Sequence, residues 1–305
     1  MDWTAEIAAA AGRILPHVIR TPAMVTDAFG PRVELKLEQL QHTGSFKARG
    51  AFNTLLSAPV PDAGIVAASG GNHGAAVACA AHRLGHRAHI FVPEMAGPSK
   101  IDLIRRMGAE LTVVPGAYAD ALAQAQDYEA KTGAMQIHAY DAPATVAGQG
   151  TVALEWEDQG LQADTVLIAV GGGGLIAGSL AWLGKRRRVV AVEPEQAATL
   201  HNALTHGADH ETDVSGIAAN ALGARRIGGI CYGLARDLDV ASITVPDSAI
   251  ADAQKRLWQA HRLLVEPAGA CALAALLSGA YRPEPDESIA VLVCGANPAP
   301  DPFLT

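Results

Sequence analysis

The chain has 305 residues, half of them apolar, which is enough to bury a large core in one domain or two smaller ones. The formal net charge of −8 argues against nucleic acid or an anionic membrane as partner, because both bind clustered positive charge. There is no C-x-x-C pair, signal peptide or long apolar span, so we expect a cytoplasmic protein with free thiols at Cys79, Cys231, Cys271 and Cys294.

Between residues 64 and 132, short apolar runs alternate regularly with helix-like segments. The first two of these helices stop at Gly85 and Gly108, which can adopt the left-handed cap. Because successive strand–helix units build a parallel sheet with helices on its faces, we expect such a sheet here. The predicted strands are 64–69, 88–92 and 111–114, and the predicted helices are 72–84, 98–107 and 118–131.

The same alternation returns after residue 164. The two halves together predict an α/β fold of two lobes with open parallel sheets, and ligands of such folds usually bind in the cleft between lobes. In this second half the predicted strands are 165–170, 189–192, 243–245 and 289–293, and the predicted helices are 175–183, 248–264 and 268–277.

Four consecutive glycines, Gly171, Gly172, Gly173 and Gly174, separate a predicted strand from a predicted helix. Backbone N–H groups in such a loop, together with the helix N-terminus, favour a phosphate group. The stretch also loosely matches a dinucleotide-binding fingerprint, with Glu193 in the place of the ribose-binding acid. By itself it leaves NAD and other phosphate cofactors equally open.

A second small-residue loop, 69–74, also lies between a predicted strand and a predicted helix. Ser69 and the free N–H groups of this loop are suited to a carboxylate at the helix N-terminus. The Asn72 amide can bond to a hydroxyl of a cofactor ring. A plain glycine turn with Asn72 as the N-cap fits the pattern equally well.

Lys47 follows Thr43-Gly44-Ser45-Phe46 at the start of an apolar helix predicted over 48–56. A single lysine is ordinarily a solvated charge. Here the positive end of the helix dipole should lower the pKa of the amine and favour its nucleophilic form.

Taken together, these motifs resemble the serine/threonine dehydratase and serine racemase family of pyridoxal 5'-phosphate (PLP) enzymes, of fold type II. The resemblance covers nearly the whole chain, in the family's order and rough spacing. Its further motifs are Arg20-Thr21-Pro22, Ala147-Gly148-Gln149-Gly150-Thr151, Glu266-Pro267 and Cys294-Gly295-Ala296-Asn297.

The resemblance implies that PLP forms a Schiff base with Lys47, in a cleft between the lobes. A thiol is a weak donor, so a cysteine beside the pyridine nitrogen should leave it largely unprotonated, which suits expulsion of a β leaving group. The other implied cofactor residues are Phe46 beside the ring, Asn72 at its hydroxyl, Gly171–Gly174 around the phosphate and Cys294 beside the nitrogen. The implied substrate loop is Ser69, Gly70, Gly71, Asn72 and His73.

The implied reaction is α,β-elimination of a β-hydroxy amino acid, such as L-serine or L-threonine, to a 2-oxo acid and ammonia. Serine racemases of the family carry a second serine where this chain has Gly70, so we expect elimination with little racemisation. An NAD-dependent oxidoreductase is the rival enzyme class, and a non-catalytic amino-acid sensor is a third interpretation. Within PLP chemistry, the alternatives are a β-replacement enzyme and an amino-acid racemase.

The family's cation site is only partly matched. Glu193 stands for its first acid and Ala197 for its carbonyl, but Thr199 replaces the second acid, so a divalent or monovalent cation has weak support. We expect a large cofactor-binding domain from residues 1–54 plus 142–305 and a small substrate-loop domain from residues 55–141. A homodimer is usual in the family, and because the sequence stops at Thr305 we expect no appended regulatory domain.

Overall fold

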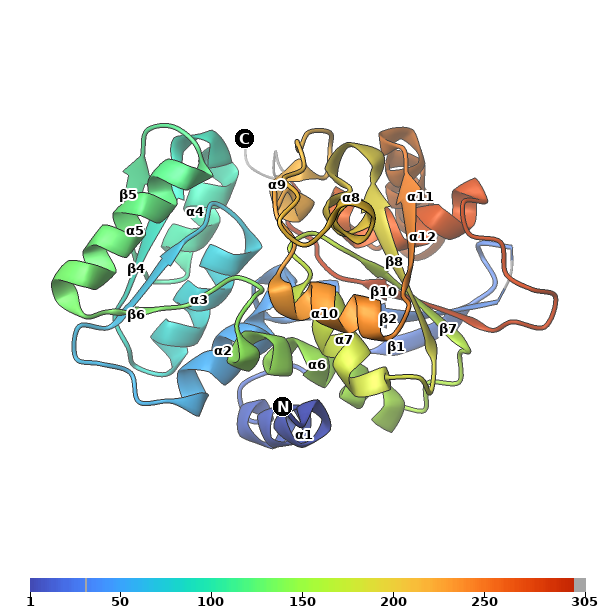
Figure 1. Cartoon of the computed structure of the whole chain (residues 1–305), viewed down its shortest axis with the longest axis horizontal. Coiled ribbons are helices and arrows are strands. Elements are labelled where there is room, and N and C mark those ends of the chain that lie inside the picture. The colour runs from blue at the N-terminus through green and yellow to red at the C-terminus, as the bar shows by residue number, and fades with distance from the viewer. Residues whose placement is uncertain (31, 299–305) are drawn as a thin grey trace.

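The computed structural model describes residues 1–30 and 32–298, which form two α/β lobes, each around its own sheet (Figure 1). The larger sheet has six strands in the order β1-β2-β10-β7-β8-β9, and the smaller has four in the order β5-β4-β3-β6. Neighbouring strands are parallel, except that β1 runs antiparallel to β2. The predicted α/β fold with parallel sheets is confirmed, with one antiparallel edge strand added.

The strands of the larger sheet are β1 (Ala23–Thr26), β2 (Val33–Leu37), β7 (Thr165–Ala169), β8 (Arg188–Pro194), β9 (Ala241–Val245) and β10 (Ile289–Val293). Those of the smaller sheet are β3 (Ile65–Ala68), β4 (Ala88–Pro93), β5 (Glu110–Val114) and β6 (Met135–Gln136). The helices are α1 (Trp3–Ile14), α2 (Lys47–Ser57), α3 (Asn72–Arg83), α4 (Pro98–Arg106), α5 (Tyr118–Thr132), α6 (Pro143–Asp158), α7 (Gly174–Leu183), α8 (Thr199–His206), α9 (Ala219–Leu222), α10 (Gly229–Asp237), α11 (Asp247–His261) and α12 (Pro267–Ser278). Short 3-10 turns are η1 (Glu38–Leu40), η2 (His42–Gly44), η3 (Glu94–Ala96) and η4 (Glu195–Ala197).

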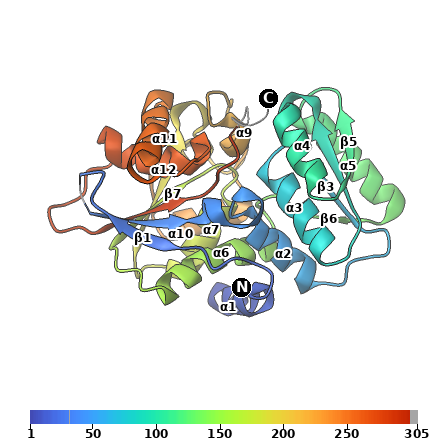
Figure 2. The ribbon, with the colours of Figure 1, turned by 180° about the vertical axis from the view of Figure 1, so that it is seen from behind.

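In the small lobe, the side chains of strand β3 alternate between two apolar clusters. Ile65 and Ala67 pack with helix α3, whereas Val66 and Ala68 pack with helix α5 on the other face (Figure 2). Because helices cover both faces, every residue of β3 is buried. This is why the strand is a continuous apolar run rather than an alternating one.

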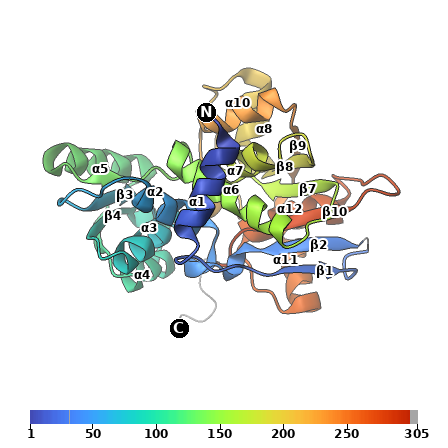
Figure 3. The same ribbon diagram turned by 90° about the horizontal axis from the view of Figure 1, so that it is seen from below.

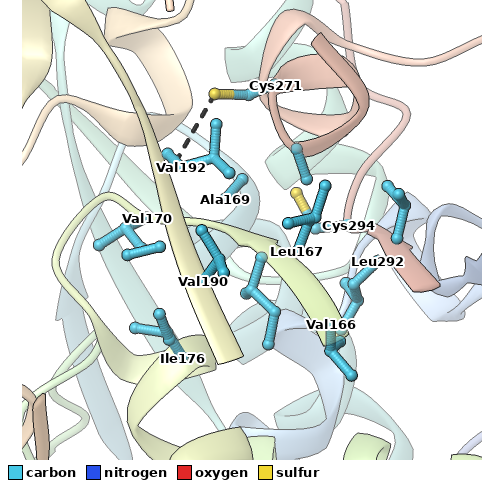
Figure 4. Packing of buried hydrophobic residues seen from close by; sticks show 14 of the residues in the cluster. Val166, Leu167, Ala169, Val170, Ile176, Val190, Val192, Cys271, Leu292 and Cys294 are labelled. Carbon is cyan, nitrogen blue, oxygen red and sulfur yellow. Dashed lines mark hydrogen bonds between the residues drawn. The ribbon is translucent and has the colours of Figure 1, made fainter. Parts of the chain in front are cut away.

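The strands of the large lobe are covered on both faces as well. Helix α12 packs against β7 to β10, and helix α7 packs against β7 and β8 (Figure 1). Val166, Val190 and Leu292 belong to the apolar cluster between these layers, shown from close by in Figure 4. In the described residues all four cysteines are free, buried thiols, and Cys271 donates to the Val192 carbonyl over 3.7 Å.

Helix α6 packs against both α2 and α7 (Figure 3). A methyl group on Gly148 would lie 2.7 Å from the Arg49 carbonyl of α2, and one on Gly150 would lie 2.9 Å from the Gly178 carbonyl of α7. These glycines let the three helix backbones approach closely. Since α2 begins at Lys47 and α7 begins at the end of the glycine loop, α6 sets the separation between the two motifs.

Every strand and helix predicted from periodicity is present, with its ends shifted by three residues or fewer. Periodicity did not predict β1, β2, β6, α1, α6, α8, α9 or α10. The three strands have five residues or fewer, which is too short for a clear repeat. The smaller sheet lies inside the expected domain 55–141, but α2 crosses residue 54, so that boundary stays a prediction. Within residues 1–30 and 32–298, no helix is long and apolar enough to cross a membrane.

Candidate active site

A cavity lies between Asn72 of the small lobe and the glycine loop of the large lobe. The structure brings residues from distant parts of the chain to its walls. Among them are all the residues predicted to hold the cofactor, namely Phe46, Lys47, Asn72, Gly171, Gly172, Gly173, Gly174 and Cys294.

Lys47 is the first residue of α2, and the segment before it is tied to the end of β10. The Phe46 N–H donates to the Cys294 carbonyl over 3.2 Å. The Lys47 amine lies 5.1 Å from the centre of the Phe46 ring and donates to the Ala139 carbonyl over 2.9 Å. The amine is therefore held between the end of β10 and the segment that leads into α6.

Burial lowers the pKa of the Lys47 amine to about 8, and the neighbouring Cys294 and Glu266 oppose the shift. Desolvation is thus the largest cause, rather than the helix dipole that the sequence suggests. A lower pKa increases the fraction of neutral amine near pH 7, and the neutral amine is the nucleophile.

A buried ion cluster anchors α2 next to Lys47. Arg49 donates to both oxygens of Glu38 over 2.9 and 2.7 Å, and its Nη2 lies 2.9 Å from Glu155 of α6. The Lys36 ammonium of β2 lies 2.6 Å from the same Glu155 oxygen. The two hydrogen bonds from the Arg49 guanidinium to the Glu38 carboxylate have a defined geometry. The cluster therefore fixes the start of α2 relative to β2 and α6.

The glycine loop between β7 and α7 is enclosed by two other segments. A methyl group on Gly171 would lie 2.8 Å from Leu222 Cα, and one on Gly174 would lie 2.9 Å from Tyr140 Cα. Gly173 has a φ of 93°, in the left-handed region that favours glycine. The first N–H groups of α7 have no acceptor within the helix, so this end of the cavity is suited to a phosphate.

The loop at 69–73 connects β3 to α3. Ser69 Oγ accepts from the Gly71 N–H over 3.2 Å, and α3 begins at Asn72, so the N-cap is Gly71 and not Asn72. The His73 ring donates from Nε2 to the Ile137 carbonyl over 2.9 Å. Burial lowers the pKa of His73 to about 3, which keeps the ring neutral. Because the ring is hydrogen-bonded to Ile137, the group that His73 leaves for a ligand at this loop is its backbone N–H.

Gly70 is enclosed on its side-chain face by η3. A methyl group on Gly70 would collide with the Ala96 methyl and would lie 3.3 Å from Pro93. The place that a serine side chain would take is therefore already filled by the turn after β4.

Two side chains fix the orientation of the Asn72 amide. Asn72 donates to Glu266 Oε1 over 2.5 Å, and its carbonyl oxygen accepts from Asn297 over 2.9 Å. Asn297 also donates to the Thr43 carbonyl over 2.7 Å, next to the Lys47 run. An amide nitrogen has two N–H groups, so Asn72 keeps one for a ligand.

The Cys294 thiol at the end of β10 is buried and donates to the Ala268 carbonyl over 3.3 Å. Burial raises the pKa of the thiol, so it remains neutral. Since its hydrogen is directed at Ala268, Cys294 presents no strong donor to the cavity.

Glu193, near the end of β8, lies apart from the cavity lining, and its side chain reaches the start of α8. Its two oxygens accept from the N–H groups of Leu200 and His201 over 2.7 and 2.8 Å, and Thr199 donates to the Ala224 carbonyl over 2.6 Å. The carboxylate thus caps a helix. This role accounts for the position of Glu193 without a bound ribose or cation. Over residues 1–30 and 32–298, no group of three or more His, Cys, Asp or Glu residues could hold a metal, so a cation at Glu193, Ala197 and Thr199 stays a prediction.

The structure also brings to the site residues that the sequence did not single out. Glu266 is 2% exposed, and burial raises its pKa to about 7, opposed by Lys100, Asn72 and Lys47. It appeared in the sequence only as part of a family motif. Tyr140 and Leu222 act through close backbone contact with the glycines, and such contacts leave no pattern in a sequence.

A family model described as "Pyridoxal-phosphate dependent enzyme" matches residues 14–295. A biosynthetic L-threonine dehydratase from Mycobacterium leprae is 36% identical over 307 residues, covering 96% of this chain and 71% of the relative. A serine racemase from Oryza sativa subsp. indica is 32% identical over 305 residues, covering 96% and 90%. The solved structure of maize serine racemase matches with a TM-score of 0.88 at 33% identity, covering 96% of this chain and 93% of the other.

Proposed function

Because the chain belongs to the pyridoxal-phosphate-dependent enzymes, we propose that it catalyses α,β-elimination of a β-hydroxy amino acid such as L-serine or L-threonine. The products are a 2-oxo acid and ammonia. The substrate enters the cavity that Lys47, the glycine loop and Asn72 line, between the two lobes.

The residues around the cavity fit PLP, the cofactor of this family. The enclosed glycine loop would hold the phosphate, the Lys47 amine would hold the aldehyde carbon, and Phe46 would lie beside the ring. The free N–H of Asn72 would bond to the ring hydroxyl, with Cys294 at the pyridine nitrogen. When bound, PLP withdraws electrons from the substrate Cα and so makes its proton removable.

The protein's own groups supply position and proton transfer. The backbone N–H groups of Gly70, Asn72 and His73 bind the substrate carboxylate, and Lys47 Nζ takes the proton from Cα. The bond between Cβ and the hydroxyl then breaks, and the hydroxyl takes up the proton that Lys47 removed from Cα and leaves as water. A water molecule later displaces the nitrogen, so the net products are one 2-oxo acid and one ammonia.

The observation that carries the proposal is Gly70. A racemase needs a second group to return a proton to the opposite face of Cα, and racemases of this family use a serine at this position. Gly70 has no side chain, and the Ala96 methyl fills the space beside it. Lys47 is then the base at the substrate Cα, without a partner from position 70, which supports elimination over racemisation.

The test is to purify the protein with PLP and to measure 2-oxo acid formation from L-serine, L-threonine, threo-3-hydroxyaspartate and a bulkier β-hydroxy amino acid in deuterated water. We expect a cofactor absorbance that borohydride bleaches, 2-oxo acid from at least one substrate, and little D-serine from L-serine. Deuterated D-serine as the main product would make the enzyme a racemase. The homodimer and the cytoplasmic location expected from the sequence stay predictions.

A further inference from the structure

Lys100 is a buried lysine that the proposed reaction does not use. It lies in α4 of the small lobe and is 3% exposed. Its ammonium crosses to the large lobe and donates to the Asn220 carbonyl of α9 over 3.4 Å. In the described part of the chain this is its one direct hydrogen bond, and no carboxylate forms an ion pair with it.

An ammonium has three N–H donors, and burying a charge is costly unless it is paired and hydrogen-bonded. A single long hydrogen bond to a neutral carbonyl does not compensate that cost. Burial lowers the pKa of Lys100, and the charge of Glu266 opposes this shift. The side chain is thus placed for an anion that the protein itself does not supply.

The ammonium lies beside the loop at 69–73. A methyl group on Gly71 would lie 3.6 Å from Lys100 Nζ and 3.5 Å from the Asn220 carbonyl. The loop also presents the N-terminus of α3, whose partial charge favours an anion. Glu266 is the nearby carboxylate, but it is hydrogen-bonded to Asn72 on the same loop.

We propose that Lys100 is the counter-ion of the substrate carboxylate bound at residues 69–73, and so selects amino acids over neutral amines. This inference rests on the proposed function, because it requires an amino-acid substrate at that loop. The carboxylate would bind between the α3 N-terminus and the ammonium.

The experiment compares two ligands that cannot undergo elimination, glycine and glycinamide, which differ in the carboxylate. The PLP-loaded enzyme is titrated with each at one pH, and the absorbance change of the cofactor gives the dissociation constant. The variants are Lys100→Gln, Lys100→Met and, as a matched control, Arg105→Met. Arg105 lies on the same helix, is 61% exposed at its side chain, and carries the same charge.

We expect Lys100→Gln and Lys100→Met to weaken glycine binding by roughly tenfold or more, since a charge-assisted hydrogen bond is lost. Glycinamide binding should change little, and Arg105→Met should affect neither ligand. Equal weakening of glycine and glycinamide binding would show that Lys100 only joins the lobes. A loss of PLP affinity with unchanged binding of both ligands would place Lys100 at the phosphate of PLP. Either result overturns the proposal.

The wild-type enzyme separates this inference from the proposed function. If glycine changes the cofactor absorbance but L-serine and L-threonine give no 2-oxo acid, the proposed elimination fails and the Lys100 test still stands. If the wild-type enzyme forms 2-oxo acid and the ratio of the two ligand affinities is unchanged in both Lys100 variants, the inference alone fails.

Discussion

Asn72 and Glu266 are 194 positions apart in the chain, yet their side chains form a 2.5 Å hydrogen bond across the cavity. The bond joins the first turn of α3 in the small lobe to the residue before α12 in the large lobe. This bond leaves the second amide N–H of Asn72 free and sets the direction in which that N–H points. The orientation of a group predicted to bind the cofactor thus depends on a residue of the other lobe.

Replacing Glu266 tests that dependence. Glu266→Gln keeps an oxygen acceptor but loses the charge, so kcat/KM for 2-oxo acid formation should fall about fivefold, for a loss of about 1 kcal/mol. Glu266→Ala removes the acceptor and should cost roughly 1.5–3 kcal/mol, or about ten- to a hundredfold. An alanine variant as active as the glutamine variant would show that Asn72 is oriented by Asn297 alone.

The raised pKa of Glu266 predicts a dependence of stability on pH. Its pKa is about 7 in the folded protein against an ordinary value of 4.5, so between these values the folded state binds more protons than the unfolded state. The free energy of unfolding should therefore fall as pH rises through this window, by up to about 3 kcal/mol from this group. Urea unfolding between pH 5 and 8 should give a shallower slope for Glu266→Gln, and an unchanged slope would assign the effect elsewhere.

The glycine loop has no room for a side chain at Gly171. In Gly171→Ala the new methyl group would lie 2.8 Å from Leu222 Cα, and the strain of about 1–3 kcal/mol should weaken PLP binding by roughly five- to a hundredfold. Gly12→Ala is the control, since nothing lies within 4 Å of a methyl group there and alanine favours the α1 helix. Equilibrium titration of the apoenzyme with PLP measures both, and equal affinities would contradict a close-fitting phosphate site.

Arg49→Met should destabilise the fold strongly. It leaves Glu38 and Glu155 without their guanidinium partner, and breaking a buried ion pair costs about 3–5 kcal/mol. Arg105→Met breaks an exposed pair with Asp102 and should cost about 1 kcal/mol or less. Urea unfolding of the two variants compares the pairs directly, and similar losses would rule out an anchoring role for the cluster at α2.

Position 70 tests the choice between elimination and racemisation. Gly70→Ser alone should perturb η3, because its side chain meets the Ala96 methyl. The double variant Gly70→Ser with Ala96→Gly has space for the hydroxyl, and D-serine should then form from L-serine in deuterated water. Chiral chromatography with mass spectrometry measures the product, and Ala96→Gly alone is the control. A double variant that still yields only 2-oxo acid would show that proton return needs more than this serine.

The order of motifs in the sequence was enough to predict the family, the α/β fold and those residues of the cavity wall that lie within the motifs. The sequence locates β3 and α7 because each is a run of apolar residues bounded by glycine or polar residues, and such a run marks a buried element. The Lys47 run and the two small-residue loops were recognisable because each is a contiguous stretch of unusual composition, whereas the role of Cys294 followed from the family resemblance alone. All of these signals are local in the chain.

Only the tertiary structure decided how these residues act together. The low pKa of Lys47 comes mainly from burial, which depends on all the surrounding elements and not on its own helix. Glu266 and Lys100 approach the Asn72 loop from the start of α12 and from α4, where nothing in their local sequence marks them. Contacts between residues distant in the chain cost conformational entropy that only the assembled fold offsets, so they exist only once both lobes are in place.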